Sequence, residues 1–254
     1  MRHAKRFVVR YLECGASQYG GMLAYSLFVS LIPLALGVVS LDGLVSQSPK
    51  RFAAFRQLLA EVFPPDVQSQ VREALLGASQ HAGTIIVLSL IGLAWFSTGL
   101  FSTTGFALNQ IYGFRNRSFW AQRLRGLWFP VALIVATLIA ILVEYAIHLL
   151  KLPRLVGLVG VWLALAALIL FMYRLAPGKM LSRSQLAPGA AVAALAIVLF
   201  GYGLTFTTQL SFQLGSDTRF FAEVFALAAW VYFIAQAILF GAVLNQAIIE
   251  GAAT

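Results

Sequence analysis

The chain has 254 residues, of which 60% are hydrophobic and only 11% are charged. Soluble domains carry about 25% charged residues, and a soluble protein of this length could not bury so much apolar surface in one core. The composition therefore excludes an ordinary soluble domain and indicates a membrane protein. The net charge of +9 fits either a nucleic-acid-binding surface or a membrane protein with basic cytoplasmic loops. The single cysteine, Cys14, excludes an internal disulfide.

Long apolar runs predict an all-α bundle of six transmembrane helices. The first run, from about Met22 to Leu41, is longer than the apolar region of a cleavable signal peptide, so we expect it to be retained as a span. No linker or obvious repeat divides the chain, which predicts one membrane domain over 1–254. The predicted spans are 21–44, 83–108, 127–149, 156–173, 188–210 and 224–248.

The segment 45–82 follows the first span and has an amphipathic pattern. Phe52, Phe55 and Leu58 recur at helical spacing, and Pro64 ends that helix. We expect amphipathic helices on the outer membrane surface, either as a structural lid or as a lateral gate for an amphiphile.

The second and fifth spans carry many polar side chains. Thr103 belongs to a run of serines and threonines in the second span, and Thr208 and Gln209 lie in the outer half of the fifth. Such groups can hydrogen-bond between closely packed helices, or they can line a polar groove. Packing is the favoured interpretation in the second span.

The most basic stretch is NQIYGFRNRSFWAQRLRGLW, residues 109–128, which we expect to begin as a loop over 109–126. Arginines among aromatic rings are typical of nucleic-acid surfaces and also of membrane edges. We favour the membrane edge, because nothing else in the chain resembles an RNA-binding module. The arginines are Arg115, Arg117, Arg123 and Arg125.

Glu144 and His148 lie four residues apart in the third span, so both project from one helical face. They are either a wet pair near the outer end of the span, which we favour, or a proton relay. The chain's histidines fall on different segments, with no metal-ligand spacing and no nucleotide or hydrolase motif. We therefore expect no metal, no cofactor and no enzymatic activity.

The distribution of lysine and arginine predicts the orientation. The segments on one side of the membrane contain eleven lysines and arginines, in the N-terminal segment, 109–126 and 174–187. The segments on the other side contain seven, in 45–82, 150–155 and 211–223. Because basic residues concentrate in cytoplasmic segments, both termini are predicted to be cytoplasmic.

Five motifs occur in an order that resembles the YihY/BrkB family of bacterial inner-membrane proteins. They are LAYSLFVSLIPL (23–34), NQIYG…RSFWAQRL (109–124), YRLAPG (173–178), APGAAVAAL (187–195) and FGAVLNQAI (240–248). The resemblance implies six helices, cytoplasmic termini and a suspected role in moving lipids or other amphiphiles. Some members were once labelled ribonuclease BN, which the residues here do not support. The family's final Gly-Ala-Glu-x-Asn motif has Val243 in place of the acid.

The sequence therefore predicts a transporter-like protein of the bacterial inner membrane that handles a lipid or anionic amphiphile. A non-transporting envelope scaffold is the alternative. The expected partners are membrane lipids, especially anionic ones. A homo-oligomer or an envelope-protein partner is also possible in this prediction, and no nucleic acid is expected. The predicted substrate-binding residues are Arg115, Arg117, Arg123, Arg125, Arg174, Asn109, Thr103, Thr208, Gln209 and Asn245.

Overall fold

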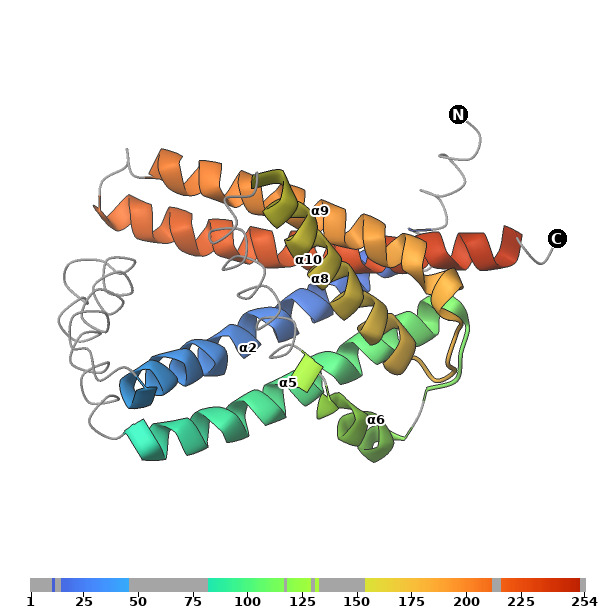
Figure 1. Ribbon diagram of the computed structural model, residues 1–254, viewed down its shortest axis with the longest axis horizontal. Helices are drawn as coiled ribbons and strands as arrows, with labels where there is room; N and C mark the ends of the chain where they lie inside the picture. Colours follow the sequence, from blue (N-terminus) through green and yellow to red (C-terminus); the bar gives the residue numbers. More distant parts are fainter. Residues whose placement is uncertain are drawn as a thin grey trace. The chain divides into compact units, whose positions relative to one another are not determined.

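The protein is all-helical in the part of the chain that the computed structural model describes (Figure 1). The structure describes residues 11, 15–45, 82–116, 118–128, 131–132, 154–211 and 216–251. The helices, labelled as in Figure 1, are α2 (Ala16–Val45), α5 (Ala82–Tyr112), α6 (Phe119–Gly126), α8 (Arg154–Leu175), α9 (Arg183–Ser211) and α10 (Ser216–Gly251).

Three of these helices contain segments long and apolar enough to cross a membrane, namely Leu155–Leu175, Arg183–Gly201 and Val224–Gly251. α2 and α5 match the first two predicted spans and have 30 and 31 residues, so each is about 45 Å long at a rise of 1.5 Å per residue. Six transmembrane helices remain a prediction. Most of the third predicted span and of segment 45–82 lies outside the described residues.

The stretch expected as a loop over 109–126 is in large part helical. α5 continues to Tyr112, where Gly113 has a φ of +68° and the Phe114 amide donates to the Asn109 carbonyl at 2.8 Å. This is a Schellman ending, in which a left-handed glycine closes the last turn. α6 then begins after a loop of a few residues. The sequence prediction missed α6 because its eight residues are too short and too polar for a span.

The chain divides into two compact units, which are described separately. The first contains Met1–Leu27, Ser97–Gly201 and Val231–Thr254, and the second contains Phe28–Phe96 and Tyr202–Trp230. In the second unit, large apolar side chains are exposed on α5 and α10, as expected for helix surfaces that face lipid. Examples are Leu88, Trp95, Phe221 and Phe225.

In the first unit, α9 and α10 approach each other through glycine. A Cβ added at Gly189 would lie 2.0 Å from the Gly241 carbonyl oxygen, and one added at Gly241 would lie 2.3 Å from the Gly189 carbonyl oxygen. Ala193, which is completely buried, lines the same contact region, because a Cβ added at Gly241 would lie 3.0 Å from its Cβ. Small residues thus bring two backbones into direct contact, a common packing mode in membranes.

Candidate functional site

Asn109, near the end of α5, joins two loops of the first unit. Its side chain is 1% exposed. The Gly178 amide donates to Asn109 Oδ1 at 2.6 Å, and Asn109 Nδ2 donates to Asn116 Oδ1 at 2.9 Å. A Cβ at Gly178 would lie 2.5 Å from the Arg115 carbonyl oxygen. One buried amide therefore fastens the loop after α5 to the loop after α8.

Asn245 plays the corresponding part between α10 and α9. Its side chain is fully buried, its Oδ1 accepts from the Gly189 amide at 2.7 Å, and its Nδ2 donates to the Leu186 carbonyl at 3.1 Å. Pro188 lies between these two partners and has no amide hydrogen to donate within the helix. The Asn245 amide therefore bridges the first turns of α9 where proline interrupts the backbone hydrogen bonding.

Two tyrosines complete this buried polar region. The Tyr173 hydroxyl donates to the Ile238 carbonyl. The Tyr112 hydroxyl is buried and interacts with the side chain of Asn245, but it makes no hydrogen bond of good geometry with any described residue. We call Asn109, Asn245, Tyr112 and Tyr173 the amide cluster. The side-chain amides of Asn109 and Asn245 form hydrogen bonds mainly with backbone groups, so the cluster positions the surrounding loops.

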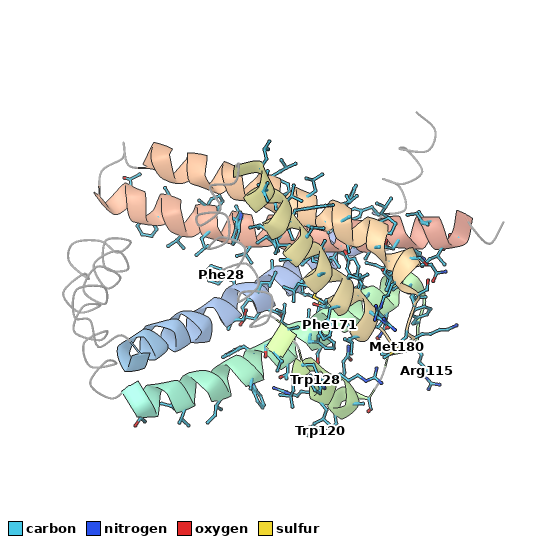
Figure 2. All side chains as sticks on the ribbon, in the orientation of Figure 1. Phe28, Arg115, Trp120, Trp128, Phe171 and Met180 are labelled. Carbon is cyan, nitrogen blue, oxygen red and sulfur yellow. The ribbon has the colours of Figure 1, made fainter. Side chains whose placement is uncertain are left out.

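Basic side chains surround the two joined loops. Arg115 is exposed in the loop after α5, and Lys179 and Arg183 are exposed after α8 and at the start of α9. Arg174 is half-buried in the last turn of α8. Figure 2 labels Arg115 and Met180, one from each loop. The contact between Gly178 and the Arg115 backbone therefore brings together two segments that carry positive charge.

α6 packs against α5 through one face. Gln122 is buried, and its Nε2 donates to the Ser102 carbonyl at 3.1 Å. A Cβ at Gly126, one turn later, would lie 3.0 Å from Thr98 Cα, and one at Gly105 would lie 2.1 Å from Gln122 Nε2. The spacing of four residues places Gln122 and Gly126 on the same side of α6, which lies along residues 98–105 of α5.

The opposite face of α6 is apolar and exposed. Trp120 is 72% exposed and Leu124 is 65% exposed, and Trp128, just after the helix, is 62% exposed (Figure 2). Arg123 and Arg125 occupy the last turn, where positive charge suits the helix dipole, and α6 contains no acidic residue. Two tryptophans beside arginines are the side chains expected at a membrane–water interface.

The sequence profile of the virulence factor BrkB family matches residues 7–253. The chain belongs to the virulence factor BrkB family. It is a membrane protein of that family, and the resemblance inferred from its motifs is confirmed. A UPF0761 membrane protein of Azoarcus sp. (strain BH72) is 26% identical over 249 residues, which cover 93% of this chain and 60% of that relative. No solved structure matches the chain.

In this BrkB-family chain the predicted site residues fall into four groups. Asn109 and Asn245 belong to the amide cluster. The four described arginines lie in the loop after α5, in α6 and in the last turn of α8, and they are Arg115, Arg123, Arg125 and Arg174. The Thr103 hydroxyl donates to the Gly99 carbonyl at 3.1 Å and contacts the Ser26 hydroxyl of α2 at 3.3 Å, so it packs helices in this conformation. The remaining predicted site residues are outside the described residues or have undescribed side chains, and they are Arg117, Glu144, His148, Thr208 and Gln209.

Sequence reasoning missed Gln122, Tyr112, Tyr173 and Gly178 as organising residues. Gln122 had a usable signal, since it lies four residues before a glycine on a helix whose other face carries Trp120. The other three had none, because their partners lie on distant segments: the Asn245 side chain for Tyr112, the Ile238 carbonyl for Tyr173 and the Asn109 side chain for Gly178. Among the described residues, no three His, Cys, Asp or Glu side chains gather in a way that could hold a metal ion.

Proposed function

We propose that this protein handles anionic lipids, or other amphiphiles with anionic headgroups, at the cytoplasmic face of the bacterial inner membrane, and that it moves them in the manner of a transporter. The observation that supports the proposal is the pair of basic loops joined by Asn109. Both termini are cytoplasmic in this proposal. It involves no chemical reaction and no nucleic acid, and the predicted homo-oligomer or envelope-protein partner is not required for it.

The electrostatic part follows from the number of charges near the joined loops. Each Lys or Arg near an anionic membrane surface contributes about 1 kcal/mol of attraction, falling off within a Debye length. Arg115, Lys179 and Arg183 are exposed, so their charges are available to headgroups. Because Asn109 and Gly178 hold the loops in contact, one headgroup layer meets charges from both loops at once.

Transfer of a headgroup would use the polar side chains of the second and fifth spans while the lipid tails stay in the bilayer. In this conformation Thr103 is bonded to Gly99 and contacts Ser26, so passage between α2 and α5 would require that contact to open. Thr104, fully buried, donates to the Leu100 carbonyl at 2.8 Å.

These satisfied hydroxyls are the specific observation that favours the second candidate, a scaffold that organises other envelope proteins without transport. A scaffold needs packed helices and no polar path. The two functions differ in one measurable property, which is whether purified protein accelerates lipid movement between leaflets.

The test is reconstitution into liposomes that contain a fluorescent anionic lipid, with flipping followed by chemical quenching of the outer leaflet. The double variant Arg115→Gln/Lys179→Gln should reduce capture and flipping of anionic lipid. A charge-matched control, Lys50→Gln/Arg51→Gln in the segment predicted to be external, should leave both unchanged. Wild-type protein that binds anionic liposomes but never accelerates flipping would favour the scaffold.

The energy source of the proposed transport is tested by Glu144→Gln. If Glu144 and His148 form a proton relay, this change abolishes the pH dependence of flipping while expression and folding stay normal. If the two are a wet pair, the change is silent, because exposed pairs contribute about 0–1 kcal/mol.

A further inference from the structure

The position of α6 along α5 fixes where the membrane surface meets the first unit. We propose that α6 lies in the cytoplasmic interface of the bilayer at the level of residues 98–105 of α5, with its tryptophan face in contact with lipid, and that the amide cluster stands on the water side of that interface. This inference requires that the chain is a membrane protein with the predicted orientation, and it is independent of lipid transport.

The chemistry of the exposed face identifies lipid as its occupant. Trp120, Leu124 and Trp128 present an apolar surface, and the adjacent Arg123 and Arg125 carry positive charge with no acid in the helix. Tryptophan prefers the headgroup level, and arginine at that level is attracted to anionic lipids. The charge complements an anionic bilayer surface, and α6 belongs to a unit that contains helices long and apolar enough to cross a membrane.

The depth follows from the packing of α6 on α5. The Gln122–Ser102 hydrogen bond and the close contact of Gly126 with Thr98 fix α6 beside residues 98–105. Asn109 and Tyr112 lie four and seven residues beyond Gly105, which is about 6 and 10 Å along the helix. One headgroup layer is about 5–7 Å thick, so these residues lie at or beyond its outer edge.

α9 gives a second, independent indication of the same boundary. Its exposed side chains are polar at Arg183 and Ser184, and they are apolar from Val192 onward, for example at Leu195. Asn245 binds α9 at Leu186 and Gly189, between these two sets. The amide cluster therefore meets α9 where its surface changes from water-facing to lipid-facing. A polar network at this level costs less than one in the hydrocarbon core.

The experiment places nitroxide labels on single cysteines in a Cys14→Ser background and measures their collision rates with oxygen and with a water-soluble nickel complex in liposomes containing anionic lipid. The labelled variants are Leu124→Cys on α6, Leu195→Cys on the apolar part of α9 and Gln110→Cys at an exposed position near the end of α5. The expected depth order is Leu195 deepest, Leu124 at the interface and Gln110 in water.

Three results would overturn the inference. Nickel access at Leu124 equal to that at Gln110 would place α6 in water. Oxygen access at Leu124 equal to that at Leu195 would place α6 in the hydrocarbon core. Spin–spin broadening at Leu124 that disappears on dilution with unlabelled protein would show that a second copy occupies the face.

Tryptophan quenching by brominated lipids tests the same depth without introduced cysteines, in case the labelled variants do not fold. Phospholipids brominated near the headgroup should quench the wild-type tryptophan fluorescence more strongly than lipids brominated near the chain end. Trp120→Phe/Trp128→Phe should lose the shallow component of quenching. Shallow quenching that is unchanged in this double variant would contradict the proposal even if the labelled proteins could not be prepared.

Discussion

Gly189→Ala tests the direct backbone contact between α9 and α10. The new Cβ would lie 2.0 Å from the Gly241 carbonyl oxygen and 2.4 Å from Asn245 Oδ1, whereas an ordinary contact begins at 3.4 Å. The two helices would have to separate by more than 1 Å, roughly the shortfall from van der Waals distance. Overpacking of this kind costs about 1–3 kcal/mol, and a weakened bond from the Gly189 amide to Asn245 adds about 1 kcal/mol or more. We therefore expect a loss of about 2–5 kcal/mol in the free energy of unfolding.

The assay is thermal unfolding of the detergent-solubilised protein, followed by tryptophan fluorescence. A loss of this size lowers the Tm by about 5–15 °C for a chain of this length. Gly201→Ala is the control on the same helix, because a Cβ there has no atom within 4 Å. Alanine's higher helix propensity should raise stability there by up to about 1 kcal/mol. Equal Tm values for the two variants would refute the close contact.

Three further predictions concern Asn245, Tyr11 and topology. Asn245→Leu leaves buried groups on α9 without partners, so it should lower the free energy of unfolding by about 2–4 kcal/mol. The control, Gln246→Leu, loses one exposed hydrogen bond on the same helix and should change this free energy by less than about 0.5 kcal/mol. Both values are measured by urea unfolding. Burial raises the pKa of Tyr11 from 10.0 to about 12, so the folded state holds the hydroxyl proton more tightly than the unfolded state does. The free energy of unfolding should therefore fall as the pH rises from 10 to 12, and Tyr11→Phe should remove that part of the loss. Reporter fusions after Glu250 and within 66–80 should report opposite sides of the membrane, and an external signal from the first would contradict the predicted orientation.

The helices that are long and apolar enough to cross a membrane were largely predictable, because their signal lies in local composition. α8 begins and ends within two residues of the predicted span 156–173, and α9 and α10 begin several residues earlier than predicted. Those earlier turns, such as Arg183 to Pro188, are polar or broken by proline, so a search for apolar runs passes over them. The single domain remains a prediction, and so does the choice between a wet pair, which we favour, and a proton relay at Glu144 and His148.

The organisation of the site was not predictable to the same degree. Asn109 and Asn245 lie in two of the motifs that resemble the family, but their long-range partners are the backbone groups of Gly178, Leu186 and Gly189. A backbone amide has no sequence signature, so only the fold shows that these side chains join segments 56 to 69 residues apart. The basic loops were predictable as charges, and their contact was not.

The contact of Gly189 with Gly241 also determines how these two helices can move. With no side chain between the backbones, neither helix can slide far without a clash. When the crossing angle changes, the helices must therefore rotate about this contact, which acts as a fulcrum. Gly201 lies twelve residues along α9, about 18 Å from the fulcrum at 1.5 Å per residue. A tilt of about 10° would carry that part of the helix about 3 Å sideways while Asn245, beside the fulcrum, kept its bonds.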